Sequence, residues 1–180
     1  MEIYVIRHGE TDFNVRKLML SRQDVSLNKT GEEQVKEAAT KLKDIHFDMI
    51  ISSPLKRTLQ TSMGINKVRE EELELVLDAR LMERDAGALS GKSLDLKLFS
   101  DYWSIKKNKK IENGERIGDF LFRVYSFLEE IKIKYKDKKI LIVTHNGVCR
   151  AINACVKGIE KIEDIKDLGQ KNCEIKVFNI

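Results

Sequence analysis

The segment Ile3-Tyr4-Val5-Ile6-Arg7-His8-Gly9-Glu10-Thr11 decides how this chain folds, because a short apolar run leads directly into charged residues and a glycine. The run at residues 3–6 is β-branched or aromatic, which is typical of a buried strand. In open α/β sheets, ligands bind at the carboxyl ends of the strands, where the loops converge. The segment therefore predicts that Arg7 and His8 lie at a ligand-binding edge.

His8 is the candidate nucleophile at this strand end. An imidazole attacks phosphorus when its ring is neutral and its second nitrogen donates a hydrogen to a fixed acceptor. Arg7 has the planar guanidinium that binds phosphate with two parallel hydrogen bonds, and we expect Gly9 to let the backbone approach a ligand closely. A histidine after a strand is more often a hydrogen-bonded structural residue, so this assignment needs support from the rest of the chain.

The composition indicates one domain spanning residues 1–180, since 42% hydrophobic residues are enough for a single core. No apolar run approaches the roughly 20 residues that span a bilayer, and the chain starts without a signal-peptide pattern, so we expect a cytoplasmic protein with no membrane partner. Three cysteines without Cys-x-x-Cys spacing argue against a disulfide framework and a zinc site. The net charge of +4 is too small to indicate nucleic acid.

Strand-like and helix-like segments alternate along the chain, which predicts an α/β fold: a three-layer α/β/α sandwich with a mostly parallel central sheet. Thr30 opens a capping-box pattern, while Ser53 and Pro54 suit the cap and first position of the next helix. Residues 115–135 carry the apolar stripe of a core helix. We expect strands at residues 3–6, 48–51, 74–77, 139–143 and 174–180.

Polar residues follow several of these strands. Asn14 lies in the polar loop of residues 12–29 and is either a phosphate contact or an ordinary turn asparagine. Arg57 lies one turn into the helix after the second strand, where a phosphate is drawn to free N–H groups. On its own, Arg57 is better explained as a solvated helix residue.

Two further strand ends carry candidate chemistry. Glu83 sits in an irregular, glycine-containing loop and is the candidate general acid, which protonates a leaving alkoxide. The alternative for Glu83 is a loop ion pair with Arg80 or Arg84. His145 follows the apolar run 139–143 and precedes a helix, so it repeats the arrangement of His8.

Residues 94–111 form a lysine-rich, weakly periodic insert that we interpret as a lid or specificity segment. Its lysine run has the composition of a solvated surface, which can also steer anions toward a crevice. The insert has no recognisable recognition pattern, so the sequence does not indicate the substrate.

Taken together, these motifs resemble the histidine phosphatase superfamily, in its phosphoglycerate mutase-like branch. The resemblance covers nearly the whole chain and is specific because the motifs occur jointly. The matching positions are Arg7-His8-Gly9-Glu10-Thr11 with Asn14, Ser53-Pro54-Leu55 with Arg57, Thr58 and Thr61, Glu83 with Gly87 and Gly91, Gly114-Glu115 with Arg123-Val124, and Thr144-His145 with Gly147.

The resemblance implies roles for individual residues. His8 would become phosphohistidine, and Glu83 would be the proton donor and then the base for water. Clamping of the phosphoryl oxygens is implied for Arg7, Arg57 and His145, the last as an imidazolium, with help from Asn14. Ser21, Arg84 and Asn146 are further implied substrate contacts. Two guanidiniums and an imidazolium are suitable stabilisers of the charge in phosphoryl transfer, so no metal or cofactor is expected.

Departures from the mutase pattern favour hydrolysis. Leu20-Ser21 and Ala86 replace two expected substrate contacts, and residues 94–111 replace a segment with paired arginines, although Arg84 and Lys92 remain mutase-like. We therefore predict a metal-independent phosphomonoesterase acting on a small phosphorylated metabolite, as a monomer or homodimer. A cofactor-dependent phosphoglycerate mutase is the second interpretation, and a non-catalytic phospholigand-binding protein is the third.

Overall fold

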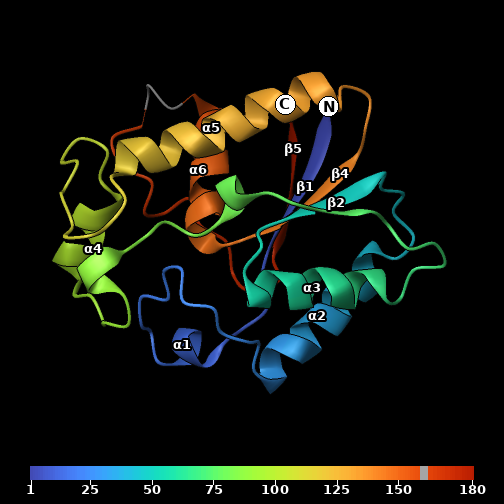
Figure 1. The fold of residues 1–180 in the computed structure, drawn as a ribbon, viewed down its shortest axis with the longest axis horizontal. Coiled ribbons are helices and arrows are strands. Elements are labelled where there is room, and N and C mark those ends of the chain that lie inside the picture. Colours follow the sequence, from blue (N-terminus) through green and yellow to red (C-terminus); the bar gives the residue numbers. More distant parts are fainter. Residues whose placement is uncertain (159–161) are drawn as a thin grey trace.

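The computed structural model describes residues 1–158 and 162–180, and these form one five-stranded sheet in the order β3-β2-β4-β1-β5 (Figure 1). The first four of these strands are parallel, and β5 runs antiparallel to β1. The predicted α/β fold with a mostly parallel sheet is confirmed. The strands are β1 (Glu2–Arg7), β2 (Met49–Ser52), β3 (Leu75–Leu77), β4 (Ile140–Thr144) and β5 (Ile175–Asn179).

Helices cover both faces of the sheet, with α5 and α6 on one side and α2 and α3 on the other (Figure 1). No helix among the described residues is long and apolar enough to cross a membrane. The helices are α1 (Asp12–Val15), α2 (Lys29–Leu42), α3 (Lys56–Asn66), α4 (Leu96–Trp103), α5 (Ile117–Lys134) and α6 (Asn146–Lys157).

The strand β4 shows why the sheet needs both helical layers. Its side chains alternate between two hydrophobic clusters, with Ile140 and Ile142 packed on the α5–α6 side and Leu141 and Val143 on the α2–α3 side. All four side chains are fully buried. Burial of each contributes about 1.5–3 kcal/mol, so the strand that ends at Thr144, directly before His145, is firmly held.

The register of the sheet brings three strand ends to one edge. Arg7 at the end of β1 pairs with Thr144 at the end of β4, and Ser52 at the end of β2 pairs with Val143. The residues that follow continue this alignment, since the His8 N–H donates to the Thr144 carbonyl at 2.9 Å. The Ser53 N–H donates to the Val143 carbonyl at 3.1 Å.

Two helices begin at different residues from those predicted. The cap of α2 is Asn28, whose side-chain oxygen accepts from the Gly31 N–H at 2.8 Å, and not Thr30. The cap position of α3 is Leu55, and not Ser53. The Ser53 hydroxyl is hydrogen-bonded to the ring of His145 at 2.7 Å and also accepts from the Leu55 N–H at 3.4 Å, so it ties the segment before the helix to His145. The helix itself begins at Lys56.

The lack of a side chain at Gly9 serves packing, which corrects the expectation that it admits a ligand. A Cβ atom at this position would lie 2.6 Å from the carbonyl oxygen of Gly31. The segment after β1 therefore packs directly on the first turn of α2. The polar segment after Gly9 also contains the short helix α1, where a continuous loop was expected.

The insert is more ordered than its lysine content indicated. Asp95 caps α4 by accepting from the Leu98 N–H at 2.7 Å, and the helix carries Tyr102 and Trp103 into the core. In Figure 1, α4 lies beyond one end of the sheet, beside the start of α5. The three cysteines are free thiols, and burial raises the pKa of the Cys149 thiol to about 12.

Candidate active site

A cavity of about 140 Å³ lies at the shared edge of β1, β2 and β4. All predicted site residues line it except His145, which is fully buried. A volume this small suits a compact ligand. The lining residues are Arg7, His8, Asn14, Leu18, Met19, Leu20, Ser21, Arg57, Glu83, Arg84, Phe99, Tyr102, Trp103, Asn146, Gly147 and Arg150.

His8 is held in one orientation and one protonation state. Its Nδ1 lies 2.7 Å from the Gly9 carbonyl oxygen, which accepts only from a protonated nitrogen, so Nε2 keeps its lone pair. The pKa of the ring is well below 6.5, chiefly because the ring is buried and further because Arg57 and Arg7 are positively charged. At neutral pH the ring is therefore a neutral imidazole with an unprotonated Nε2, the state required of a nucleophile.

His145 lies with its ring centroid 5.3 Å from that of His8, and both of its nitrogens are engaged by the protein. The Arg57 Nε donates to Nδ1 at 3.1 Å, so Nε2 carries the hydrogen and donates to the Ser53 hydroxyl at 2.7 Å. Burial is the main reason that its pKa is well below 6.5. The structure therefore differs from the expected imidazolium: His145 is a neutral ring whose Nδ1 accepts from Arg57.

Arg57 is completely buried and joins several parts of the site. Besides His145, its guanidinium donates to the carbonyl oxygens of Gln23 at 2.7 Å and Ser21 at 2.9 Å. Three of its five N–H groups are thus used by the protein, which leaves two for a ligand. Burial lowers the pKa of Arg57 to about 10, so it is still a cation at neutral pH.

Arg7 and Asn14 also line the cavity. Arg7 Nη1 donates to the Gln170 carbonyl at 2.9 Å, and its buried Nε has no acceptor among the described residues. The Asn14 side-chain oxygen accepts from the Thr11 N–H at 3.1 Å and so completes the capping box of α1, whose N-cap is Thr11. Asn14 therefore has the turn role that the sequence allowed; it also borders the cavity, and its contact with a phosphate stays a prediction.

The carboxylate of Glu83 is fixed by two main-chain donors. The Arg84 N–H donates to Oε1 at 2.8 Å, and the Gly147 N–H, in the first turn of α6, donates to Oε2 at 3.0 Å. A Cβ atom at position 147 would lie 2.0 Å from Oε1, so a larger residue there would displace the Glu83 carboxylate. The predicted loop ion pair with Arg80 or Arg84 is not what holds this side chain, and Glu83 borders the same cavity as His8.

A family model described as histidine phosphatase superfamily (branch 1) matches residues 3–180 of this sequence. The chain belongs to the histidine phosphatase superfamily. The prediction that it is an enzyme of this superfamily is therefore confirmed.

Some relatives are named as phosphatases and others as phosphoglycerate mutases. The protein named uncharacterized phosphatase PhoE, from Bacillus subtilis, is 31% identical over 187 residues, which is 92% of each chain. The protein named probable phosphoglycerate mutase GpmB, from Escherichia coli, is 26% identical over 97% of this chain and 83% of its own. The solved structure of Bacillus stearothermophilus YhfR has a TM-score of 0.87 at 24% identity, over 99% of this chain and 91% of that one, and so shares the fold.

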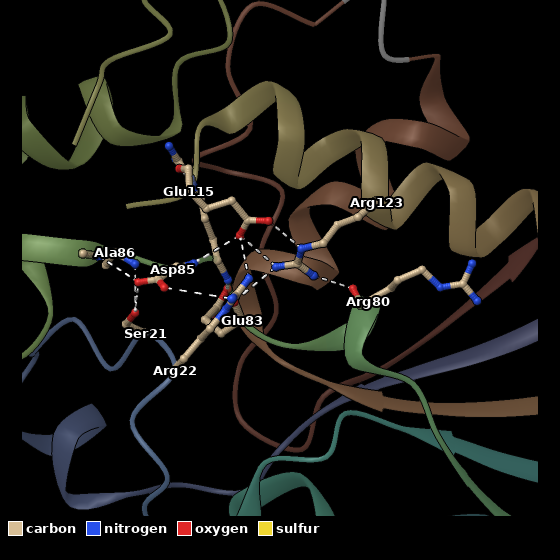
Figure 2. A network of polar contacts seen from close by, with 10 residues as sticks. Ser21, Arg22, Arg80, Glu83, Asp85, Ala86, Glu115 and Arg123 are labelled. Atoms are coloured by element: carbon tan, nitrogen blue, oxygen red, sulfur yellow. Dashed lines mark hydrogen bonds and ion pairs between the residues drawn. The ribbon is translucent and has the colours of Figure 1, made fainter. Parts of the chain in front are cut away.

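In this histidine phosphatase, a polar network clamps the main chain at Glu83 (Figure 2). The carbonyl oxygen of Glu83 accepts from Arg22 Nε at 3.1 Å and from Arg123 Nη2 at 3.2 Å. Both arginines are held by one carboxylate, that of Glu115, at 3.3 Å from Arg22 Nη2 and 2.6 Å from Arg123 Nε. The same carboxylate accepts from the Asp85 N–H at 3.2 Å. Glu115 therefore fixes the loop that carries Glu83.

Replacing Glu115 by glutamine is expected to destabilise the protein by roughly 3 kcal/mol, because two arginines then lose a nearly buried counter-charge. The free energy of unfolding in urea measures this loss. Glu130→Gln is the matched control, since Glu130 pairs with Arg80 at 2.8 Å on the exposed surface and its loss should have little effect. Equal losses in both variants would contradict the proposed importance of the network.

Two predicted substrate contacts have other partners. The Ser21 hydroxyl accepts from the Ala86 N–H at 2.8 Å and lies 3.4 Å from an Asp85 oxygen, so it tethers the Glu83 loop and is not free for a ligand. The Asn146 side-chain oxygen accepts from the Gln170 N–H at 2.9 Å. Lys92 is exposed and does not line the cavity.

The two buried histidines make the protein sensitive to acid. Their pKa values are below 6.5 in the folded state, so the unfolded chain takes up protons first as the pH falls. Their stabilising contribution is complete above pH 6.5 and is lost below it, by up to about 1.4 kcal/mol per histidine and pH unit. We expect the free energy of unfolding in urea titrations to fall as the pH is lowered from 7 to 5.5.

The comparison of variants checks the source of this acid sensitivity. His145→Asn should reduce this dependence on pH, because it removes one of the two buried rings whose pKa is lowered in the folded state. A stability that is flat across this pH range would show that the buried rings take up protons as readily as the unfolded chain does.

Sequence reasoning missed six cavity residues: Leu18, Met19, Phe99, Tyr102, Trp103 and Arg150. A signal was present for Arg150, which lies four residues after Asn146 and so on the same face of a helix that starts at the site. The three aromatic residues are surrounded by lysines and serines in the sequence, which obscured their common face on α4.

Proposed function

We propose that this protein is a phosphomonoesterase that acts on a small phosphorylated metabolite through a phosphohistidine on His8. The neutral His8 ring, with its Nδ1 held by the Gly9 carbonyl, is the observation that carries this proposal. No other nucleophile in the cavity is held in this way: the Ser21 hydroxyl is bonded to Ala86. The phosphatase name of the 31% identical relative supports the same activity.

The reaction proceeds in two displacements. In the first, His8 Nε2 attacks phosphorus, the bond to the ester oxygen breaks, and Glu83 transfers its proton to that leaving oxygen. In the second, water attacks phosphohistidine while the Glu83 carboxylate accepts a proton from it, and the P–N bond breaks to release inorganic phosphate. Glu83 is thereby returned to its protonated form, so the cycle is balanced in protons.

The charges around His8 suit a phosphoryl group. Arg7 and Arg57 supply guanidinium N–H groups, which neutralise the charge that spreads over the phosphoryl oxygens during transfer. Both groups are already fixed by bonds to main-chain carbonyls, so little reorganisation is required when the charge develops. Activity is expected to persist when a metal chelator is present.

A phosphoglycerate-type mutase is the second candidate, favoured by Arg84 in the cavity and by the aromatic residues of α4 that close one side of it. Against it, the Ser21 hydroxyl is engaged by the Glu83 loop, and the buried Ala86 offers only a methyl group. A mutase must retain its phosphorylated product while this turns over the nucleophile, which requires dedicated contacts.

The test measures both reactions on one preparation. Phosphoglycerate is supplied with and without a bisphosphoglycerate primer, and isomer interconversion is compared with phosphate release from a panel of monoesters. The proposal expects phosphate release to dominate. Primed interconversion that exceeds every hydrolysis rate by orders of magnitude would establish the mutase instead. Action as a monomer or homodimer, without nucleic acid or membrane partners, stays a prediction.

A further inference from the structure

The segment 169–174, which leads into β5, is hydrogen-bonded to the end of β1 that carries His8. The Cys173 N–H donates to the Arg7 carbonyl at 3.0 Å. The side-chain nitrogen of Asn172 donates to the His8 carbonyl at 2.9 Å, although these two residues are 164 positions apart in the sequence. The last turn of the chain before β5 is therefore built onto the main chain of the proposed nucleophile.

Several contacts hold this turn in one conformation. The Gln170 side chain donates to the carbonyls of Val5 at 3.0 Å and Glu174 at 2.8 Å, and the Gln170 carbonyl accepts from the Arg7 guanidinium at 2.9 Å. Cys173 has a φ of 54°, in the left-handed region that residues other than glycine rarely adopt. Such a backbone costs free energy and persists where the surrounding contacts require it, most often near functional sites.

Asn172 also contacts Asn14, and the partners of the two residues fix the orientation of both amides. The Asn172 nitrogen lies 3.3 Å from the Asn14 oxygen. A carbonyl oxygen only accepts, so the Asn172 atom beside the His8 carbonyl is the NH2 group. A main-chain N–H only donates, so the Asn14 atom 3.1 Å from the Thr11 N–H is the oxygen. Turning over either amide would break these bonds.

Three donors surround the Asn14 oxygen: the Thr11 N–H, the Thr11 hydroxyl at 3.1 Å and the Asn172 NH2 group. The Asn14 NH2 group has no acceptor among the described residues, and Asn14 lines the cavity that contains His8. A phosphoryl oxygen only accepts, so it is this NH2 group that suits a phosphoryl ligand. Asn172 is half-buried and does not line the cavity.

We propose that Asn172 is a positioning residue, which is anchored on the His8 carbonyl and turns the Asn14 NH2 group toward the phosphoryl oxygens. This deepens the proposed function and rests on it, because the phosphoryl group is the ligand that the Asn14 donor serves. A donor that is already oriented needs no rearrangement when charge develops on its ligand. Asn172 thus contributes to phosphoryl transfer without contacting the substrate.

Asn172→Asp tests this by replacing the NH2 group with an oxygen of similar size. That oxygen faces the acceptor oxygen of Asn14, so it favours a reversed Asn14 amide that presents its oxygen to the phosphoryl site. Calorimetry with orthovanadate, a mimic of the transferring phosphoryl group, measures the effect on the full chain without turnover. Vanadate affinity should fall roughly 10- to 100-fold in Asn172→Asp. It should fall roughly three- to tenfold in Asn172→Ala, in which Thr11 still holds the Asn14 oxygen.

A double-mutant cycle with Asn14→Ala distinguishes this role from a general effect on the fold. In the Asn14→Ala background no amide is left to be reversed, so Asn172→Asp should reduce vanadate affinity by less than about threefold. Lys171→Met is the control for charge, because it lowers the net charge by the same one unit at an exposed neighbour and should leave the affinity unchanged. A loss from Asn172→Asp that is equally large in both backgrounds would overturn the proposal.

Nitrogen-15 spectra give a readout that a purely structural role would not change. The side-chain NH2 signals of Asn14, identified by their absence in Asn14→Ala, should shift when vanadate binds to wild type. They should shift much less when vanadate binds to Asn172→Asp. Equal shifts in the two proteins would contradict the assigned role. If Asn172→Asp does not fold, Asn172→Ala takes its place, and its smaller loss should disappear in the Asn14→Ala background.

The two proposals fail separately. If nitrophenyl phosphate is hydrolysed but Asn172→Asp binds vanadate as wild type does, phosphatase activity stands and the role of Asn172 does not. If the vanadate measurements agree with the double-mutant cycle but no monoester is hydrolysed, the role of Asn172 stands and the phosphatase does not.

Discussion

Replacing His8 by alanine is expected to abolish phosphate release, with a loss of at least roughly ten-thousand-fold, because no other group in the cavity can take its place as nucleophile. Only the wild-type protein should form a phosphorylated intermediate when it is mixed with labelled substrate and quenched in denaturant. The label should be stable in alkali and labile in acid, as expected for a phosphorus–nitrogen bond. Residual activity near the wild-type level would rule out His8 as the nucleophile.

The His8→Ala experiment must distinguish loss of the nucleophile from loss of the folded structure. His8 is 2% exposed and bonds to the Gly9 carbonyl, so its removal leaves a small hole at the end of β1. Near-ultraviolet circular dichroism and the urea midpoint report whether the sheet is intact. His46→Ala is the matched control, because His46 is exposed and lies outside the cavity. It should retain full activity.

Much of this site was predictable because several of its residues directly follow buried strands that the sequence identifies. The apolar runs before His8 and His145 identify two buried strands, and parallel pairing of β1 with β4 then places both rings at one edge. The order of the strands is not encoded in any one segment. A mostly parallel sheet nevertheless requires that the carboxyl ends of its parallel strands share an edge.

The features that sequence reasoning missed depend on contacts between distant residues. Ser53 has the side chain of a helix cap, but its hydroxyl is hydrogen-bonded to His145, which lies 92 positions away in the sequence. The charge of His145 was wrongly predicted for a similar reason, because complete burial and the nearby Arg57 keep its ring neutral. Residue type alone does not reveal either effect.

Glu83→Gln is expected to slow the hydrolysis of alkyl phosphates by roughly 100- to 10,000-fold, the usual contribution of a general acid. The amide keeps the size of the side chain and still accepts from one of the N–H groups of Arg84 and Gly147, but it has no proton to give. Nitrophenyl phosphate should lose less than about tenfold in the first displacement, because nitrophenolate leaves without protonation. The measurement is a plot of log kcat/KM against the pKa of the leaving alcohol.

The slope of this plot distinguishes proton donation by Glu83 from a purely structural role of its side chain. Wild type should show a shallow slope, since Glu83 compensates for poor leaving groups, whereas Glu83→Gln should show a steep one. Glu112→Gln is the control, because Glu112 is exposed beside the same loop and its loss should leave the line unchanged. A parallel downward shift of the Glu83→Gln line would mean that the side chain only holds the loop against α6. In that case another group must donate the proton, and the hydrogen bond from Gly147 to Glu83 would be purely structural.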